Sequence, residues 1–470
     1  MDATELCYTP ATELAGAIRS KQVSPVEVVE AVLARIERLN PRLNAYCTVT
    51  AAAARAAAKE AEAAVMRGDA LGVLHGVPVS VKDLVATKGV RTTHGSKLYE
   101  QFIPDDDAPV VERLKGAGAI ILGKTNTPEF GHKAITDNRV FGPSRNPWSL
   151  EHTPGGSSGG AAAAVATGLG PLAVGTDAGG SVRIPASCCA IFGLKPTLGL
   201  IPYAPTFGGL ETLSHVGPMT RTVRDAAQML NAMVGADARD LSSFPSPEAD
   251  YLAGLDRGIQ GLRVAWSPDW GYAAVDPQVR QLAEAAAQRF TELGCRVEEA
   301  HPGTSDPAET YQILTTASRA ARVADRWPAE RERFDPSLVA QIEAGLRWSA
   351  VDFVRAANVR RTMNDSFLRF FSRHDLLLTP TMAAPPPPVK VEAHEEIAGR
   401  KVTRLGWLAF TFPLSLIGYP AASVPCGWTR EGLPVGLQIV APRWAEALVL
   451  RAAAAFEAMA PWAHKRPALD

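Results

Sequence analysis

The stretch 153-TPGGSSGGAAAAVATGLGPLAVGTDAGGSVRIPAS-187 places two serines, Ser157 and Ser181, in two glycine-rich loops. Glycine weakens helices and strands, so it is common where the backbone takes special angles or lies close to a ligand. The alanine-rich run from Gly159 to Gly175 between the loops predicts a buried helix followed by a strand. Two hydroxyl-bearing loops joined in this way indicate that both serines belong to one site.

The N-terminal part of the chain is expected to be helical. Residues 24–27 (SPVE) form a capping box with proline at the first helical position, and the apolar pattern continues until Asn40-Pro41. We expect the helix to end there, because proline interrupts helical hydrogen bonding. Residues 50–67 are rich in Ala, Glu and Lys, and Gly68 follows them, which predicts a second helix with a glycine stop.

After these helices, short apolar runs alternate with helical or glycine-rich segments, which is the pattern of an α/β protein. The expected strands lie at 77–81, 119–122, 171–175, 190–194, 263–266, 295–300, 376–381, 421–427 and 432–440. We expect one domain over 1–470. Its expected parts are N-terminal helices (1–70), a catalytic region (71–235), a variable helical insertion (236–375) and the C-terminal part of the same α/β core (376–470).

Charge and composition argue against several functional classes. The formal net charge of −1 provides no basic surface for nucleic acid. The start, MDATELCYTP, lacks the basic and apolar regions of a signal peptide, and no run offers the ~20 strongly apolar residues of a membrane-spanning helix. The six cysteines and nine histidines show no metal-ligand spacing. We therefore expect no metal or cofactor, no membrane, and free thiols in a reducing cytoplasm.

Two motif matches compete with a site built from both serines. Residues 118–125 satisfy the phosphate-loop pattern GxxxxGK[ST], but the variable positions are Ala-Ile-Ile-Leu, a buried-strand sequence, and Pro128 follows where a helix is needed. Residues 155–159 satisfy the GxSxG elbow of α/β hydrolases, which requires a hydrophobic strand before it. Residues 143–154 are instead polar and broken by prolines. Both matches are interpreted as coincidence.

Lys82 offers a base for the two hydroxyls. It ends the run 75-HGVPVSVKDLV-85, in which every second residue is valine, so this strand is buried on at least one face and leads Lys82 inward or to a sheet edge. A lysine at a strand end can also be a surface ion pair. With an ordinary pKa near 10.4, keeping lysine neutral at pH 7 costs roughly 4.6 kcal/mol, so a base role requires burial.

The motifs GVPVSVKD (76–83), PGGSSGG (154–160) and TDAGGSVRIPAS (176–187) together resemble the amidase signature family. Similar segments are GLKPTLGLIP, KTNTPEF and FPLSLIGYPAASVPCGWTREGLPVGLQIVAP, so the resemblance covers nearly the whole chain. It implies an α/β/α fold around a mixed, mostly parallel sheet flanked by helices. It also implies a Ser–cis-Ser–Lys triad, with a cis peptide before the bridging serine.

Carried onto this chain, the resemblance makes Ser181 the nucleophile, Ser157 the bridging serine and Lys82 the base. The implied oxyanion hole consists of the backbone amides of Ala178, Gly179, Gly180 and Ser181. Supporting roles are expected for Ser158, Thr176, Asp177 and Arg183. Asp177 and Arg183 are explained equally well as a structural ion pair, and Ser158 as a cap of the helix that begins at Gly159.

The resemblance implies a hydrolase that cleaves C–N bonds of small amides through an acyl-enzyme, with aryl amides, esters and carbamates as further substrate classes. Candidate substrate-binding residues are Thr127, Phe130, Gly131 and Ile184, and the aromatic residues Tyr203, Phe207, Trp270 and Trp407 are expected in the core or the pocket. The alternative is a glutaminase subunit that supplies ammonia to a partner. Such subunits carry glutamine where this chain has Ile184, which favours a stand-alone enzyme for uncharged amides. A homodimer is a further expectation.

Overall fold

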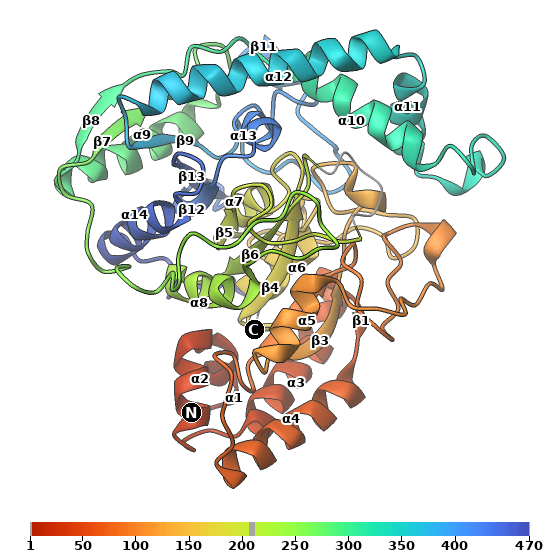
Figure 1. Cartoon of the computed structure of the whole chain (residues 1–470), viewed down its shortest axis with the longest axis vertical. Helices are drawn as coiled ribbons and strands as arrows, with labels where there is room; N and C mark the ends of the chain where they lie inside the picture. Colours follow the sequence, from red (N-terminus) through yellow and green to blue (C-terminus); the bar gives the residue numbers. More distant parts are fainter. Residues whose placement is uncertain (1, 206–211, 470) are drawn as a thin grey trace.

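A computed structural model describes residues 2–205 and 212–469. Its core is an 11-stranded sheet in the order β1-β3-β2-β4-β6-β5-β12-β13-β9-β7-β8 (Figure 1). The strands are β1 (Tyr46–Val49), β2 (Pro78–Lys82), β3 (Ile120–Thr125), β4 (Leu172–Asp177), β5 (Phe192–Lys195), β6 (His215–Thr220), β7 (Arg263–Trp266), β8 (Arg296–Glu299), β9 (Leu376–Pro380), β12 (Ala421–Trp428) and β13 (Pro434–Val440). A separate hairpin pairs β10 (Glu396–Ile397) with β11 (Arg400–Lys401).

The sheet is mixed, and its parallel pairs lie in two flanks. Strands β3, β2 and β4 run parallel to one another, as do β9, β7 and β8. The other six neighbouring pairs, including all those between β4 and β9, are antiparallel. The expected mixed sheet between helices is therefore present, although parallel pairing accounts for only four of its ten neighbour pairs.

Helices cover both faces of the sheet, because the central strands bury side chains on both sides. In β9, Leu376 and Leu378 pack into one apolar cluster and Leu377 into the opposite one. The first cluster joins α5 (Pro109–Gly116), α8 (Val223–Met233), α9 (Pro277–Glu292) and α14 (Glu446–Met459). The second joins α6 (Gly159–Ala166), α7 (Arg183–Cys189), α10 (Ala308–Arg322), α12 (Ala350–Phe371) and α13 (Phe412–Ile417). None of the described helices is long and apolar enough to cross a membrane.

The N-terminal helices are α1 (Ala3–Tyr8), α2 (Ala11–Arg19), α3 (Pro25–Leu43) and α4 (Ala51–Arg67). The capping box at Ser24 and the stop at Gly68, which has φ 80°, are as expected. The expected end of α3 before Pro41 is wrong, because the helix continues to Leu43. Asn44 ends it in the left-handed conformation, so Pro41 lies in the final turn, where a lost hydrogen bond costs least.

The segment 236–375 contributes α9, α10, α11 (Pro336–Gly345) and α12, and it also contributes β7 and β8 to the main sheet. Figure 1 shows α10, α11 and α12 at the end of the molecule opposite the N-terminal helices α1–α4. Two strands of the main sheet, β1 and β6, and both strands of the β10–β11 hairpin lie where no strand was predicted. Strand β1 pairs with β3, and β6 pairs with β4 and β5, so tertiary pairing supports both.

Candidate active site

The two serine loops and Lys82 meet at one edge of the sheet. Strands β2 and β4 are parallel neighbours, so their carboxyl ends lie together. Lys82 is the last residue of β2, and Ser181 lies in the loop that leads from β4 to α7. Ser157 comes just before α6, and its peptide bond with Gly156 is cis, as the resemblance implied. A Cβ at residue 156 would meet the backbone of Ile135 at 2.6 Å, which explains the glycine.

The Lys82 amine is fully buried among hydroxyl groups. Its Nζ lies 2.7 Å from Ser157 Oγ, 2.8 Å from Ser158 Oγ and 2.9 Å from Thr176 Oγ1. Ser158 Oγ donates to the carbonyl of Thr176 at 3.2 Å and makes no capping hydrogen bond to α6. The alternative explanation of Ser158 as a helix cap therefore does not apply, and its hydroxyl contacts the lysine instead.

Burial lowers the pKa of Lys82 well below its ordinary 10.5, although the negative charge of Asp177 acts in the opposite direction. Desolvation has this effect because the uncharged amine loses less hydration than the ammonium. A neutral amine has two N–H donors and one lone pair, so one of the three neighbouring hydroxyls has to donate to it. Ser158 already donates to a carbonyl, which leaves Ser157 or Thr176 for this role.

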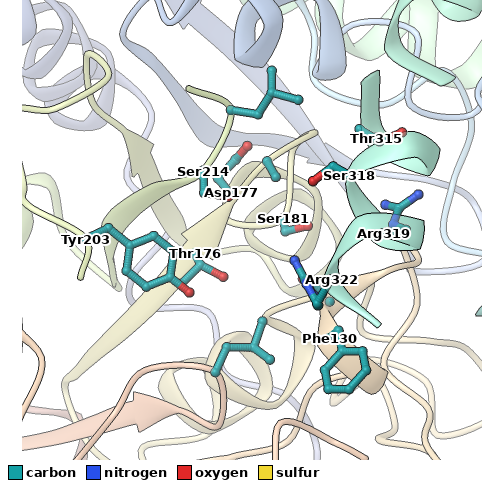
Figure 2. A pocket seen from close by; sticks show the side chains of 15 residues that line it. Phe130, Thr176, Asp177, Ser181, Tyr203, Ser214, Thr315, Ser318, Arg319 and Arg322 are labelled. Carbon is teal, nitrogen blue, oxygen red and sulfur yellow. The ribbon is translucent and has the colours of Figure 1, made fainter. Parts of the chain in front are cut away.

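Ser181 is half-buried, and its side chain faces the same pocket as Ser157 (Figure 2). The main chains of the two loops are joined, because the amide of Ser158 donates to the carbonyl of Ser181 at 3.2 Å. Within residues 2–205 and 212–469, Ser181 Oγ has no hydrogen bond to Ser157 Oγ. The structure thus contains the contact between the lysine and the first serine, while the two serines share a pocket without a direct bond.

Asp177 and Arg183 brace the loop that carries Ser181. The Asp177 carboxylate accepts from Arg183 at 2.9 and 3.0 Å, from the amide of Val182 and from Ser415 Oγ. Arg183 also donates to Gln438 at 2.8 Å. Burial acts to raise the pKa of Asp177, but the Arg183 guanidinium holds it below its ordinary 3.8. Both charges are fully buried and paired with each other, so their role is to order the loop.

One of the four backbone amides predicted for the oxyanion hole, that of Gly180, already has a hydrogen-bond acceptor. The N–H of Gly180 donates to Asp177 at 2.7 Å, so it is already engaged. A Cβ at Gly179 would meet Tyr311 Oη at 2.1 Å, and one at Gly180 would meet Thr411 Oγ1 at 2.3 Å. Both glycines are therefore required by close packing, and Gly180 also has φ +125°. The amides of Ala178, Gly179 and Ser181 have no hydrogen-bond acceptor among the described residues.

The pocket has two lobes that meet at Ser181. Three predicted substrate-binding residues line them: Phe130 and Gly131 in the first lobe, and Gly131 and Ile184 in the second. The fourth predicted residue, Thr127, lines neither lobe. Its side chain is fully buried, and its carbonyl accepts from Asn138 at 2.8 Å in the loop network below the pocket.

Among the aromatic residues, Tyr203 lines the first lobe. Trp270 and Trp407 pack in the apolar cluster instead, and Phe207 lies outside the described residues.

Several lining residues were not predicted, and most of them come from the segment 236–375 and the chain that follows it. Tyr311, Thr315, Ser318, Arg319 and Arg322 all belong to α10. Leu84, Leu213 and Ser214 complete the first lobe, and Lys133, Glu392 and Arg404 line the second. On a helix of mixed charge, such arginines have the same pattern as a solvated face, so the sequence contains no signal that marks them.

The two coincidental motifs have structural explanations. Most of the phosphate-loop match is strand β3, and the amine of Lys124 is fully buried, where it donates to Val85 O and to Thr87 Oγ1 at 2.8 Å. It is not available to a phosphate. In the described chain no strand directly precedes Ser157, so the hydrolase elbow is absent as well. The described residues contain no cluster of three or more His, Cys, Asp or Glu that could hold a metal ion.

A sequence model of the family described as Amidase matches residues 27–450 of the chain. An acylamidase of Rhodococcus erythropolis is 42% identical over 472 residues, with 100% of this chain and 99% of the relative covered. A glutamyl-tRNA(Gln) amidotransferase subunit of Geobacter sp. (strain M21) is 37% identical, with 97% and 98% covered.

Among solved structures, a bacterial aryl acylamidase of the amidase signature family superimposes with a TM-score of 0.91. It is 34% identical, and 97% of each chain is covered. The sequence and the fold therefore agree along nearly the full length. The chain belongs to the amidase signature family, and it is an amidohydrolase that cleaves the carbon–nitrogen bond of amides.

Proposed function

We propose that this chain is a stand-alone acylamidase in which Ser181 is the nucleophile, Ser157 transfers the proton and Lys82 is the base. The observation that carries the proposal is the buried Lys82 amine, 2.7 Å from Ser157 Oγ and below the loop that presents Ser181. Its lowered pKa supplies a neutral base. Hydrogen bonds at active sites often shorten only when substrate binds. The proposal is therefore compatible with the lack of a direct Ser157–Ser181 hydrogen bond among the described residues of this structure.

The proposed reaction has two halves. Ser181 Oγ attacks the amide carbonyl while its proton passes to Ser157 and the Ser157 proton passes to Lys82. Lys82 returns a proton by the same route to the leaving nitrogen, the C–N bond breaks, and the acyl group stays on Ser181 as an ester. Water then attacks this ester with the same relay, which releases the carboxylic acid and restores the Ser181 hydroxyl.

The negative charge on the carbonyl oxygen needs donors near Ser181. We assign this role to the amides of Ala178, Gly179 and Ser181, because the Gly180 amide is occupied by Asp177. The braced Asp177–Arg183 pair holds the loop in this conformation. Loss of one such donor typically costs about 3–4 kcal/mol of transition-state stabilisation.

The glutaminase alternative has less support. The amidotransferase subunit of Geobacter is 37% identical to this chain, whereas the Rhodococcus acylamidase is 42% identical. Ile184, in a position where glutamine was expected for such subunits, is buried and lines the second lobe. An apolar side chain there favours an enzyme that acts without a partner.

We further propose that the chain forms one domain, because the strands of 236–375 belong to the same sheet as those before and after them. A cytoplasmic location is supported by six cysteines that are all free thiols. The homodimer and the lack of a nucleic-acid partner stay predictions.

The proposed function is tested with a panel of acyl anilides, primary amides, esters and carbamates. We expect the wild-type protein to hydrolyse at least one anilide or amide without ATP or a partner, and Ser181→Ala to hydrolyse none. Mass spectrometry of the wild type, quenched during turnover of an ester, should find the acyl group on Ser181. Acylation at another residue, or an active and folded Ser181→Ala protein, would contradict the proposal.

A further inference from the structure

Three arginines surround the pocket that contains Ser181. Arg319 and Arg322 come from α10, and Arg404 comes from the chain before α13. Arg319 lines both lobes, Arg322 the first and Arg404 the second. Figure 2 shows Arg322 extending from α10 toward Ser181, with Arg319 one turn away on the same helix. Positive charge therefore lies on both sides of the proposed nucleophile.

Arg319 and Arg404 are not paired with carboxylates of the described residues. Arg319 donates a short hydrogen bond to Gln341, a neutral amide, and neither Arg319 nor Arg404 forms an ion pair within residues 2–205 and 212–469. Of the two carboxylates that line the pocket, Asp177 is bound by Arg183, and Glu392 lies 3.1 Å from Lys133. Both carboxylates are thus paired with other cations, although Glu392 also acts on Arg404: burial lowers the pKa of Arg404, and the charge of Glu392 acts in the opposite direction.

Such an arrangement is unfavourable in the empty enzyme. Removal of a cation from water without a counterion costs free energy, and nearby like charges add to this cost. Burial lowers the pKa of Arg319 to about 9, and the guanidiniums of Arg404 and Arg322 act in the same direction. Arg319 stays charged at neutral pH. Unbalanced charge that faces a pocket is typical of a site where the ligand brings the opposite charge.

We propose that the preferred substrates are amides that carry a carboxylate, which Arg319 binds together with Arg322 or Arg404 while Ser181 attacks the amide carbonyl. This inference rests on the proposed function of Ser181. A guanidinium matches the two oxygens of a carboxylate with parallel N–H donors, so it orients the ligand as well as attracting it. The apolar residues Leu84, Phe130 and Leu213 are available to the uncharged part of the substrate.

The carboxylate can stand on the acyl side or on the leaving amine, and two matched pairs of substrates distinguish these cases. Succinanilate is compared with butyranilide for the acyl side, and 4-acetamidobenzoate with 4-methylacetanilide for the amine side. We expect the charged member of one pair to have a kcat/KM at least about tenfold above its neutral partner, because hydrogen bonds to charged groups are among the stronger ones. The pair that shows this preference identifies the side.

Three variants test which cations are responsible. In Arg319→Gln and Arg404→Gln, we expect the ratio of kcat/KM for the charged substrate to kcat/KM for the neutral one to fall about tenfold. In Arg319→Lys this ratio should fall less, because lysine keeps the charge but lacks the two parallel N–H donors of a guanidinium. Arg361→Gln is the matched control, because this arginine is exposed on α12. Thermal unfolding monitors the fold of each variant. If Arg319→Gln does not fold, Arg404→Gln still tests the inference.

The outcomes separate this inference from the proposed function. Equal kcat/KM within both pairs, with Ser181→Ala inactive on every substrate, overturns the carboxylate preference and leaves the function intact. Hydrolysis of other amides of the panel but of neither charged anilide overturns it as well. A preference that persists in both Arg319→Gln and Arg404→Gln contradicts the assigned residues. Turnover by Ser181→Ala contradicts the proposed function itself.

Discussion

The signature loops and α10 both line the pocket, but their polar groups are arranged differently. In the loops the buried charges are matched: Asp177 binds Arg183, and the Lys82 amine lies among three hydroxyls. On α10, the charge of Arg319 meets only a neutral amide. Buried groups whose hydrogen bonds and charges are all satisfied are fixed in one geometry, whereas a charged group without a counterion is available to bind a ligand. We therefore propose that the loops carry out the chemistry and that the helical segment selects the substrate.

Replacement of the proposed nucleophile has the largest expected effect, and it tests the role of the signature loops. We expect Ser181→Ala to lower kcat by at least about 10⁴-fold, since removal of a nucleophile disables the whole catalytic unit. Circular dichroism should report a folded protein, because Ser181 is half-buried and its side chain faces the pocket. The measurement is kcat on the best amide of the panel. Residual activity near the wild-type level would remove Ser181 from the mechanism.

Lys82→Met comes next, because it removes the base and keeps the length of the side chain. We expect a loss of kcat of about 10³-fold or more, within the range for general bases and activated nucleophiles. Lys124→Met is the matched control for loss of a buried strand lysine, since Lys124 contacts Val85 and Thr87 rather than the serines. Thermal unfolding separates instability from catalysis. Equal kcat losses in two folded variants would contradict a specific role for Lys82.

The oxyanion loop predicts a smaller but clear effect for Gly179→Ala. The new Cβ would meet Tyr311 Oη at 2.1 Å, so either the Tyr311 ring or the loop has to shift, and we expect the loop amides to leave their positions. We expect kcat to fall about 10²-fold, similar to the loss of one donor, with KM changed much less. Gly16→Ala, in the open middle of α2, should leave kcat unchanged and raise stability by up to about 1 kcal/mol. An unchanged kcat for Gly179→Ala would contradict the assignment of the oxyanion hole to this loop.

The pKa of Lys82 determines the pH profile. Burial lowers this pKa, and the base is active only when neutral, so activity falls as the pH drops through the pKa and Lys82 gains a proton. We expect kcat/KM on a neutral anilide to climb from about pH 6 toward about pH 8–9, by about tenfold per pH unit on the acid limb. A neutral substrate avoids titration of the ligand. A flat profile over this range contradicts a titrating lysine.

Thr127→Val should have the smallest effect on catalysis, because Thr127 lines neither lobe. Its hydroxyl donates to Pro128 O at 3.3 Å within a fully buried loop. We expect kcat/KM within about twofold of wild type and a loss of about 1 kcal/mol in the free energy of unfolding, the usual value of one hydrogen bond. A large change in KM without a change in stability would restore Thr127 to the pocket.

Much of the site could be predicted from the sequence, because glycine-rich loops and the ends of strands are recognised from residues that are close together in the chain. Lys82 ends a strand of alternating valines, and the serines lie in glycine-rich loops, so both signals are visible in the sequence. The structure adds the reason for the glycines, because a Cβ at Gly156 or Gly179 has no room. The resemblance to a family then assigned their roles. By contrast, the engagement of the Gly180 amide by Asp177 depends on one loop conformation, and the continuation of α3 through Pro41 depends on its cap at Asn44.

The amino-acid order alone determined the α/β class, the helix that separates the two serines and the identity of the three proposed catalytic groups, because each follows from residues close in sequence. Only the tertiary structure decided what surrounds them. The fold brings Lys82, at the end of β2, within 2.7 Å of Ser157 in the loop before α6, and α10 places Arg319 in the pocket that contains Ser181. The charge at a pocket is a sum over distant segments, so it exists only once the chain has folded.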